Sequence, residues 1–126
     1  MGREYLIDTN AVIDYQDNKM PGKANKLIDG IDSKISVITR MELLAWLGAD
    51  EEQTLVLKEF IDASEVFALE ETVILKAIDI RKTYRTKLPD AIIAATAAVN
   101  NLGLITRNTK DFEKIEELKV VNPYDM

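Results

Sequence analysis

The chain has 126 residues, which fits a single domain spanning residues 1–126, and 47% of them are hydrophobic, enough for a packed core. It contains neither cysteine nor histidine. This excludes disulfides, zinc sites built on thiolates or imidazoles, and nucleophilic systems that need either residue. Any catalysis must therefore come from carboxylates, hydroxyls, lysines or a bound metal.

The charge and the amino terminus narrow the function further. The net charge of −6 argues against a nucleic-acid partner. That argument is weak where clustered acids bind divalent cations, because the ligands themselves add to the negative count. The chain shows no signal peptide and no apolar run long enough to cross a bilayer. We therefore expect a cytoplasmic protein without a membrane association.

Short apolar segments alternate with amphipathic segments along the chain. The apolar segments predict strands over residues 5–7, 35–38, 66–69, 104–106 and 119–121. Helices are predicted from Ala11, over 24–31, over 41–47 up to Gly48, after Asp50, over 73–84 and from Asp90. The alternation is typical of a parallel sheet covered on both faces. The predicted fold class is thus α/β.

Four acidic residues follow the predicted strands or open a helix. Asp8 comes directly after the first strand, and Glu42 comes one helical turn after the second. Asp90 opens an alanine-rich helix, and Asp111 follows the fourth strand by a short loop. In an open parallel sheet, ligands bind beyond the carboxyl ends of the strands. We therefore expect these four side chains to share one edge of the sheet.

Each acid also has a purely structural interpretation. Asp8 is a preferred N-cap residue for the helix after it. Thr39 and Glu42 have the spacing of a capping box. Asp90 could complement a helix dipole behind Pro89, and Asp111 could cap a short helix together with Asn108. These explanations are independent of one another, whereas one metal site predicts all four acids together.

The chemistry of such a cluster requires cations. Mg²⁺ and Mn²⁺ prefer oxygen ligands, and Mg²⁺ keeps several of its waters. A bound metal lowers the pKa of a water and neutralises charge on an attacked phosphate, which replaces the missing histidine. Carboxylates without a metal would repel both one another and a phosphate substrate.

At these residues the sequence resembles PIN domains, and more narrowly the toxin subunit, VapC, of VapBC toxin–antitoxin pairs. The resemblance rests on four segments in the family's order, which span nearly the whole chain. They are Leu6-Ile7-Asp8-Thr9-Asn10, Ile38-Thr39-Arg40-Met41-Glu42-Leu43, Leu88-Pro89-Asp90-Ala91-Ile92-Ile93-Ala94-Ala95-Thr96-Ala97 and Leu104-Ile105-Thr106-Arg107-Asn108-Thr109-Lys110-Asp111-Phe112. Each segment alone is weakly specific, but the ordered set is specific.

The resemblance implies a three-layer α/β/α sandwich with a central parallel sheet. It implies endonucleolytic cleavage of RNA with Mg²⁺ or Mn²⁺, a homodimer, and an antitoxin that blocks the site. The family's metal-binding and catalytic acids carry over to Asp8, Glu42, Asp90 and Asp111. Its supporting polar residues carry over to Thr9 or Asn10, and to Thr106 or Asn108.

Two further groups of residues suggest binding surfaces. Basic residues precede Asp90 at positions Arg81, Lys82, Arg85 and Lys87. They either complement the end of a helix dipole or steer an RNA backbone toward the acids. The predicted helix over 41–47 is apolar nearly all round. We expect Met41 and Leu44 in the core, and Trp46 and Leu47 in a groove for a partner.

Other function classes fit less well. A PIN-like scaffold that binds RNA or protein without cutting is the main alternative, but all four acids are present. A phosphorylated receiver domain would need a pair of acids after the first strand and a lysine after the last. A haloacid-type phosphatase would need Asp-x-Asp at the first strand, and Asn10 stands at the third position.

Overall fold

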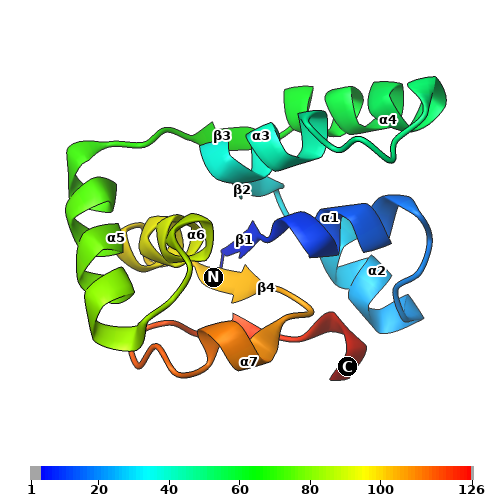
Figure 1. The fold of residues 1–126 in the computed structure, drawn as a ribbon. Helices are drawn as coiled ribbons and strands as arrows, with labels where there is room; N and C mark the ends of the chain where they lie inside the picture. Colours follow the sequence, from blue (N-terminus) through cyan, green and yellow to red (C-terminus); the bar gives the residue numbers. More distant parts are fainter. Residues whose placement is uncertain (1–3, 126) are drawn as a thin grey trace.

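The computed structural model describes residues 4–125. Its strands are β1 (Tyr5–Ile7), β2 (Lys34–Ser36), β3 (Glu65–Phe67), β4 (Gly103–Ile105) and β5 (Val120–Val121). They form one parallel sheet in the order β1-β4-β5 and a parallel pair of β2 with β3. Because β2 packs beside β1, the strands follow the order β3-β2-β1-β4-β5 across the molecule (Figure 1). The predicted parallel α/β architecture is confirmed.

Helices cover both faces of these strands. They are α1 (Thr9–Gln16), α2 (Gly22–Asp29), α3 (Val37–Leu44), α4 (Glu51–Asp62), α5 (Glu71–Tyr84), α6 (Leu88–Val99) and α7 (Thr109–Phe112), followed by a 3-10 turn, η1 (Pro123–Asp125). In Figure 1, α5 and α6 lie at one side of the sheet and α1 and α2 at the other. The arrangement is the three-layer sandwich that the resemblance implies.

Alternating side chains of the central strands divide the core in two. Leu6 of β1 and Leu104 of β4 belong to the cluster packed under α5 and α6. Their neighbours Ile7 and Ile105 belong to the cluster under α1, α2 and α4. All four side chains are fully buried. Because successive strand residues point to opposite faces, each strand needs apolar residues throughout, which explains the continuous apolar runs.

The segment from 34 to 47 differs from the sequence prediction. The second strand ends at Ser36 rather than residue 38, because Ser36 is the N-cap of α3 and its hydroxyl accepts a hydrogen bond from Thr39 N at 3.1 Å. The predicted capping box of Thr39 with Glu42 is therefore wrong, since Thr39 lies inside the helix. Helix α3 ends at Leu44, so Gly48 does not terminate it, and Trp46 and Leu47 lie outside it.

Two core predictions on α3 are also wrong. Met41 and Leu44 are 59% and 45% exposed, whereas Leu43 and Thr39 are buried. The register that follows from the Ser36 cap turns positions 39 and 43 inward, because residues four apart share a face of a helix. The apolar character of this helix therefore continues onto its exposed surface.

The remaining differences concern element boundaries. The first helix begins at Thr9 rather than Ala11, and the alanine-rich helix begins at Leu88 rather than Asp90. The strands predicted over 66–69 and 104–106 each begin and end earlier in the structure. Within residues 4–125, no helix is long and apolar enough to cross a membrane. The cytoplasmic location stays a prediction.

Candidate active site

Asp8 lies at the carboxyl end of β1 and is 4% exposed. It is the N-cap of α1, and its Oδ1 accepts a hydrogen bond from Thr9 N at 2.8 Å. Its Oδ2 accepts from the Thr106 hydroxyl at 2.8 Å and from Asn10 Nδ2 at 3.0 Å. The capping interpretation is thus correct, but it uses only one oxygen. The second oxygen is held by side chains from α1 and from the end of β4.

Glu42 reaches the same edge from α3. Its Oε1 accepts a hydrogen bond from the Thr9 hydroxyl at 2.6 Å, and the hydroxyls of Thr9 and Thr39 lie 3.0 Å apart. Thr39 is fully buried. Thr9, the residue directly after Asp8, therefore connects the carboxyl end of β1 to Glu42 on α3. From its spacing to Glu42, the sequence suggested a helix cap at Thr39. Nothing in the sequence indicated that Thr39 contacts Thr9.

The loop after β4 connects Asp8 to Asp111. The hydroxyl of Thr106, which donates to Asp8, accepts a hydrogen bond from Asn108 N at 3.0 Å. Asn108 Nδ2 in turn donates to Asp111 Oδ2 at 2.6 Å. Asn108 occupies the N-cap position of α7, but its side chain forms no capping hydrogen bond. Its amide therefore orients the carboxylate of Asp111.

Asp90 is half-buried in the first turn of α6, behind Pro89. Partial burial raises the pKa of its carboxyl, and the charges of Asp111 and Glu42 raise it further, while Lys87 lowers it. The pKa of Asp8 rises to about 6, chiefly through burial, with Asp90 and Glu42 adding to the shift against the hydrogen bonds from Thr106 and Thr9. The charges of the other acids therefore act on both Asp8 and Asp90, as expected for members of one cluster.

The donor set of this cluster suits a hard cation. Among the residues that the structure describes, none of these four carboxylates forms an ion pair with a lysine or arginine. In the same range, no three acidic side chains converge closely enough to bind one ion directly. Mg²⁺ needs only one or two carboxylates, because it keeps several waters. The residue types of the cluster are therefore compatible with a hydrated divalent ion, and the metal site stays a prediction.

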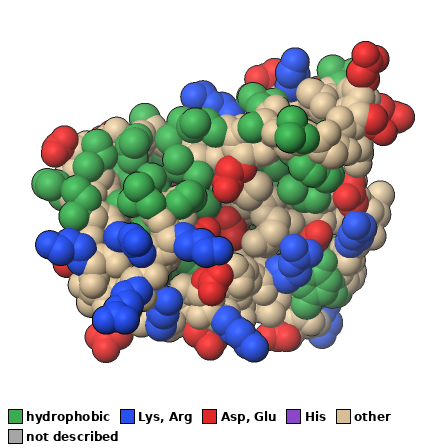
Figure 2. Space-filling view, in the orientation of Figure 1, with side chains coloured by type: hydrophobic (Ala, Val, Ile, Leu, Met, Phe, Trp, Pro, Cys, Tyr) green, Lys and Arg blue, Asp and Glu red, His purple; other side chains and the backbone are tan. Residues whose placement is uncertain are grey.

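The remaining predicted residues lie outside this network. Arg81 and Lys82 occupy the last turn of α5, where they complement the helix dipole, and Arg85 is its C-cap. Lys87 is the N-cap residue of α6, and all four of these basic side chains are exposed. Leu47 is fully exposed, while Trp46 is half-buried against the core cluster under α1. Figure 2 shows acidic side chains near the middle of one face, with lysines and arginines beside them.

One buried ionic group escaped the sequence analysis. Asp14 on α1 is 3% exposed and is paired with Arg107 and Tyr124. Asp14 lies three residues after Ala11, on the buried face of α1. This spacing could have indicated from the sequence that Asp14 is buried and that its carboxylate needs a partner.

Comparison with known proteins identifies a family and two relatives of this chain. The PIN domain family matches residues 5–118. Ribonuclease VapC1 of Methanocaldococcus jannaschii is 30% identical, over 89% of this chain and 81% of the relative. Ribonuclease VapC of Rickettsia bellii is 31% identical, over 92% of this chain and 93% of the relative.

A solved structure agrees with these relatives. The toxin–antitoxin complex from Klebsiella pneumoniae contains a chain with 33% identity and a TM-score of 0.79, over 98% of this chain and 100% of that one. The fold is thus an α/β sandwich with acids at the carboxyl ends of its parallel strands. The chain belongs to the PIN domain family.

Proposed function

We propose that this protein is an endoribonuclease that uses Mg²⁺ or Mn²⁺ and serves as the toxin of a toxin–antitoxin pair. The observation that carries the proposal is that Asp90 and Glu42, from two other elements, both act on the charge of Asp8, while Asp111 is linked to Asp8 through the loop after β4. The two ribonuclease relatives support cleavage of RNA, and the toxin–antitoxin structure supports the biological role.

The residues have distinct tasks in this mechanism. When bound, the cation supplies a water of lowered pKa and neutralises charge on the attacked phosphate. Asp8 would hold the cation in the most fixed orientation, because both of its oxygens accept hydrogen bonds. Thr9 keeps the exposed Glu42 turned toward the cluster. Asn108 does the same for Asp111.

Cleavage of structured RNA by the purified protein tests this function. We expect cutting with Mn²⁺ or Mg²⁺, none with EDTA, and restoration by added metal. Glu42→Gln should lose cleavage, whereas Glu59→Gln, an exposed glutamate on α4, should keep it. Cleavage that persists in EDTA would exclude a metal-dependent enzyme. RNA binding without any cleavage would instead support the non-cutting scaffold.

The basic residues beside the cluster extend the proposal to substrate binding. Arg81, Lys82, Arg85 and Lys87 are exposed and precede Asp90 along the chain. RNA binding by an inactive Asp90→Asn protein should weaken with added salt, because phosphate contacts release counterions. Lys87→Gln should reduce that salt dependence, whereas Lys23→Gln, on α2, should leave it unchanged. An unchanged salt dependence for Lys87→Gln would remove Lys87 from the RNA-binding surface.

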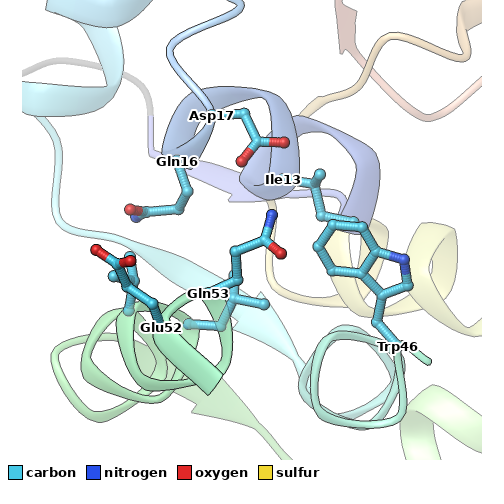
Figure 3. A pocket seen from close by; sticks show the side chains of 8 residues that line it. Ile13, Gln16, Asp17, Trp46, Glu52 and Gln53 are labelled. Carbon is cyan, nitrogen blue, oxygen red and sulfur yellow. The ribbon is translucent and has the colours of Figure 1, made fainter. Parts of the chain in front are cut away.

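A pocket beside Trp46 supports the antitoxin interface. The pocket has a volume of about 150 Å³ and lies between α1 and α4, with Ile13, Val56 and the indole of Trp46 among its lining residues. Asp17 and Glu52 also line it (Figure 3). An antitoxin segment with a bulky apolar residue next to a lysine or arginine would complement this pocket in shape and charge.

Substitutions at the pocket separate an interface from a core position. Trp46→Ala should leave the isolated protein folded and weaken antitoxin binding by about 2 kcal/mol or more, as for a buried aromatic anchor. Leu47→Asp should weaken binding too, whereas Val99→Asp on α6 should not. If Trp46→Ala instead cost roughly 3–5 kcal/mol of folding stability with unchanged antitoxin affinity, the interface role would be wrong.

An exposed apolar surface on α5 supports the homodimer. Leu75 and Ile78 are 59% and 48% exposed, on the side of α5 away from its buried Val73, Ala77 and Ile80. Figure 2 shows hydrophobic side chains gathered over α5 and α6. A second copy of this chain would cover such a patch. Sedimentation should show a dimer that Ile78→Asp converts to a monomer and that Leu55→Asp, on α4, leaves intact.

A further inference from the structure

Asp14 occupies an unusual position for a carboxylate. It lies on the buried face of α1 and is 3% exposed. Its Oδ2 accepts hydrogen bonds from Arg107 Nη1 at 3.0 Å and from the Tyr124 hydroxyl at 2.7 Å, and its Oδ1 accepts from Arg107 Nη1 at 3.3 Å. A buried charge is tolerated only when it is paired and hydrogen-bonded. Asp14 therefore constrains both of its partners.

The two partners come from distant parts of the chain. Arg107 belongs to the loop between β4 and α7, and Tyr124 belongs to η1 at the carboxyl-terminal end of the described residues. Burial raises the pKa of Tyr124, and the hydrogen bond to Asp14 raises it further. The phenol thus remains a hydrogen-bond donor to Asp14 through the neutral range. One carboxylate joins α1, the loop and the terminal turn.

The backbone of Arg107 connects this carboxylate to the acidic cluster. Arg107 N donates a hydrogen bond to Asn10 Oδ1 at 3.0 Å. The residue before it, Thr106, donates to Asp8, and the residue after it, Asn108, donates to Asp111. A displacement of Arg107 would therefore disturb the groups that orient two of the four acids, although Asp14 itself touches none of them.

We propose that Asp14 is a positioning residue that fixes the loop 106–108 of the acidic cluster, and that it does so only while Tyr124 is docked on it. The terminal turn then becomes part of the active-site support. Pro123 beside it is buried, and Tyr124 N donates a hydrogen bond to Asn122 Oδ1 at 2.9 Å, so both contacts support this docking. Without the Tyr124 hydroxyl, Asp14 loses one of its donors. Its ion pair with Arg107, whose side chain is 56% exposed, is then held less firmly, and Arg107 turns toward solvent more often.

Amide exchange measured by NMR on the full chain tests the positioning without any substrate. Tyr124→Phe removes only the hydroxyl, and we expect exchange of the Arg107 and Asn108 amides to rise about tenfold. The Asp8 amide, which donates to Ile105 O, should stay at its wild-type rate. The matched control is Tyr15→Phe. Tyr15 lies on α1, as Asp14 does, and its hydroxyl donates a hydrogen bond to Asp29 on α2.

Any of four results would overturn the positioning role. The first is unchanged exchange at Arg107 and Asn108 in Tyr124→Phe. The second is a parallel rise at every amide, which would mean a loss of global stability only. The third is the same local rise in Tyr15→Phe. Asp14→Asn, which removes the charge and keeps the shape, should reproduce the local rise, and its failure to do so would also count against the proposal.

The catalytic consequence rests on the proposed ribonuclease function. With RNA as substrate, Asp14→Asn and Tyr124→Phe should lower kcat about tenfold, as the loss of an outer support of a metal site does, and leave KM within about twofold. If Asp14 had a purely structural role, its variants would have a smaller active fraction and an unchanged apparent Mn²⁺ affinity. If the variants misplace the acids, the apparent Mn²⁺ affinity should be weaker. If the wild type cuts no RNA, the proposed function fails and the exchange experiment still decides the role of Asp14.

Discussion

Asp8 is the N-cap of α1, and Asp14 lies six positions later inside the same helix. The protein compensates the charges of these two carboxylates differently. Both are almost fully buried, at 4% and 3% exposed. Asp14 has the guanidinium of Arg107 within 3.0 Å. Within residues 4–125, the donors to Asp8 are all neutral, namely a backbone amide, the Thr106 hydroxyl and the Asn10 side chain.

This difference in charge compensation indicates different roles: the carboxylate of Asp14 stabilises the fold, whereas that of Asp8 lacks a counter-charge that a ligand could supply. Asp14 carries its own counter-charge, so its ion pair is complete within the chain. Burial raises the pKa of Asp8 to about 6, and the neighbouring acids add to this shift. A group with this pKa is ionised at neutral pH at a cost to the fold, which a divalent cation would offset.

The largest expected effect is on catalysis. Asp8→Asn keeps the shape but removes the charge that the cation needs. The new amide nitrogen also cannot accept the hydrogen bonds that Asp8 Oδ2 accepts from Thr106 and Asn10. Loss of several kcal/mol of transition-state stabilisation corresponds to a drop in RNA cleavage of about a thousandfold. Single-turnover rates with Mn²⁺ would show it. Asp62→Asn, an exposed acid at the end of α4, serves as the control and should cut at the wild-type rate.

The pH dependence of metal-free stability sharpens the contrast. Between the ordinary pKa of 3.8 and about 6, the folded state holds a proton on Asp8 that the unfolded state has released. Stability must then fall as the pH rises through this window, by about 3 kcal/mol from this group. Denaturant unfolding in EDTA should show the fall in the wild type relative to Asp8→Asn. A constant difference between the two proteins from pH 4 to 7 would contradict the raised pKa.

Cation binding should restore what the ionised cluster loses. A cation at one hundred times its dissociation constant stabilises a folded protein by about 2.7 kcal/mol. The melting temperature should therefore rise with Mn²⁺ at pH 7.5 and rise less in Asp90→Asn. The rise should shrink as the pH falls below about 6, because Asp8 becomes protonated. An equal rise in Asp90→Asn would remove Asp90 from the set of ligands.

The smallest expected effect is on the fold itself, and it has the opposite sign at the two acids. Asp14→Asn weakens a charged hydrogen bond, so it should destabilise the metal-free protein by about 2 kcal/mol. Asp8→Asn at pH 7 should stabilise it, because it removes an uncompensated buried charge. Urea midpoints of both variants test the comparison directly. Destabilisation of equal size in both would mean that the two carboxylates are not treated differently.

The sequence alone determined the architecture and the main residues of the candidate site. Continuous apolar runs such as Tyr5–Ile7 indicated strands buried on both faces, and the turn from each strand into a helix placed Asp8 and Asp111 at one edge. Acidic residues at the ends of such strands can be recognised in the sequence, because few other polar residues interrupt the apolar runs. The resemblance to PIN domains added the order of the acids.

Only the tertiary structure decided how these residues are held. The cap at Ser36 set the register of α3, which buried Thr39 and exposed Met41, and local spacing favoured a different cap. The linkage of Glu42 to Thr9 joins positions 33 residues apart, and that of Asp14 to Tyr124 joins positions 110 apart. Contacts across such distances depend on how the elements pack, because helical periodicity describes only neighbours three or four residues apart.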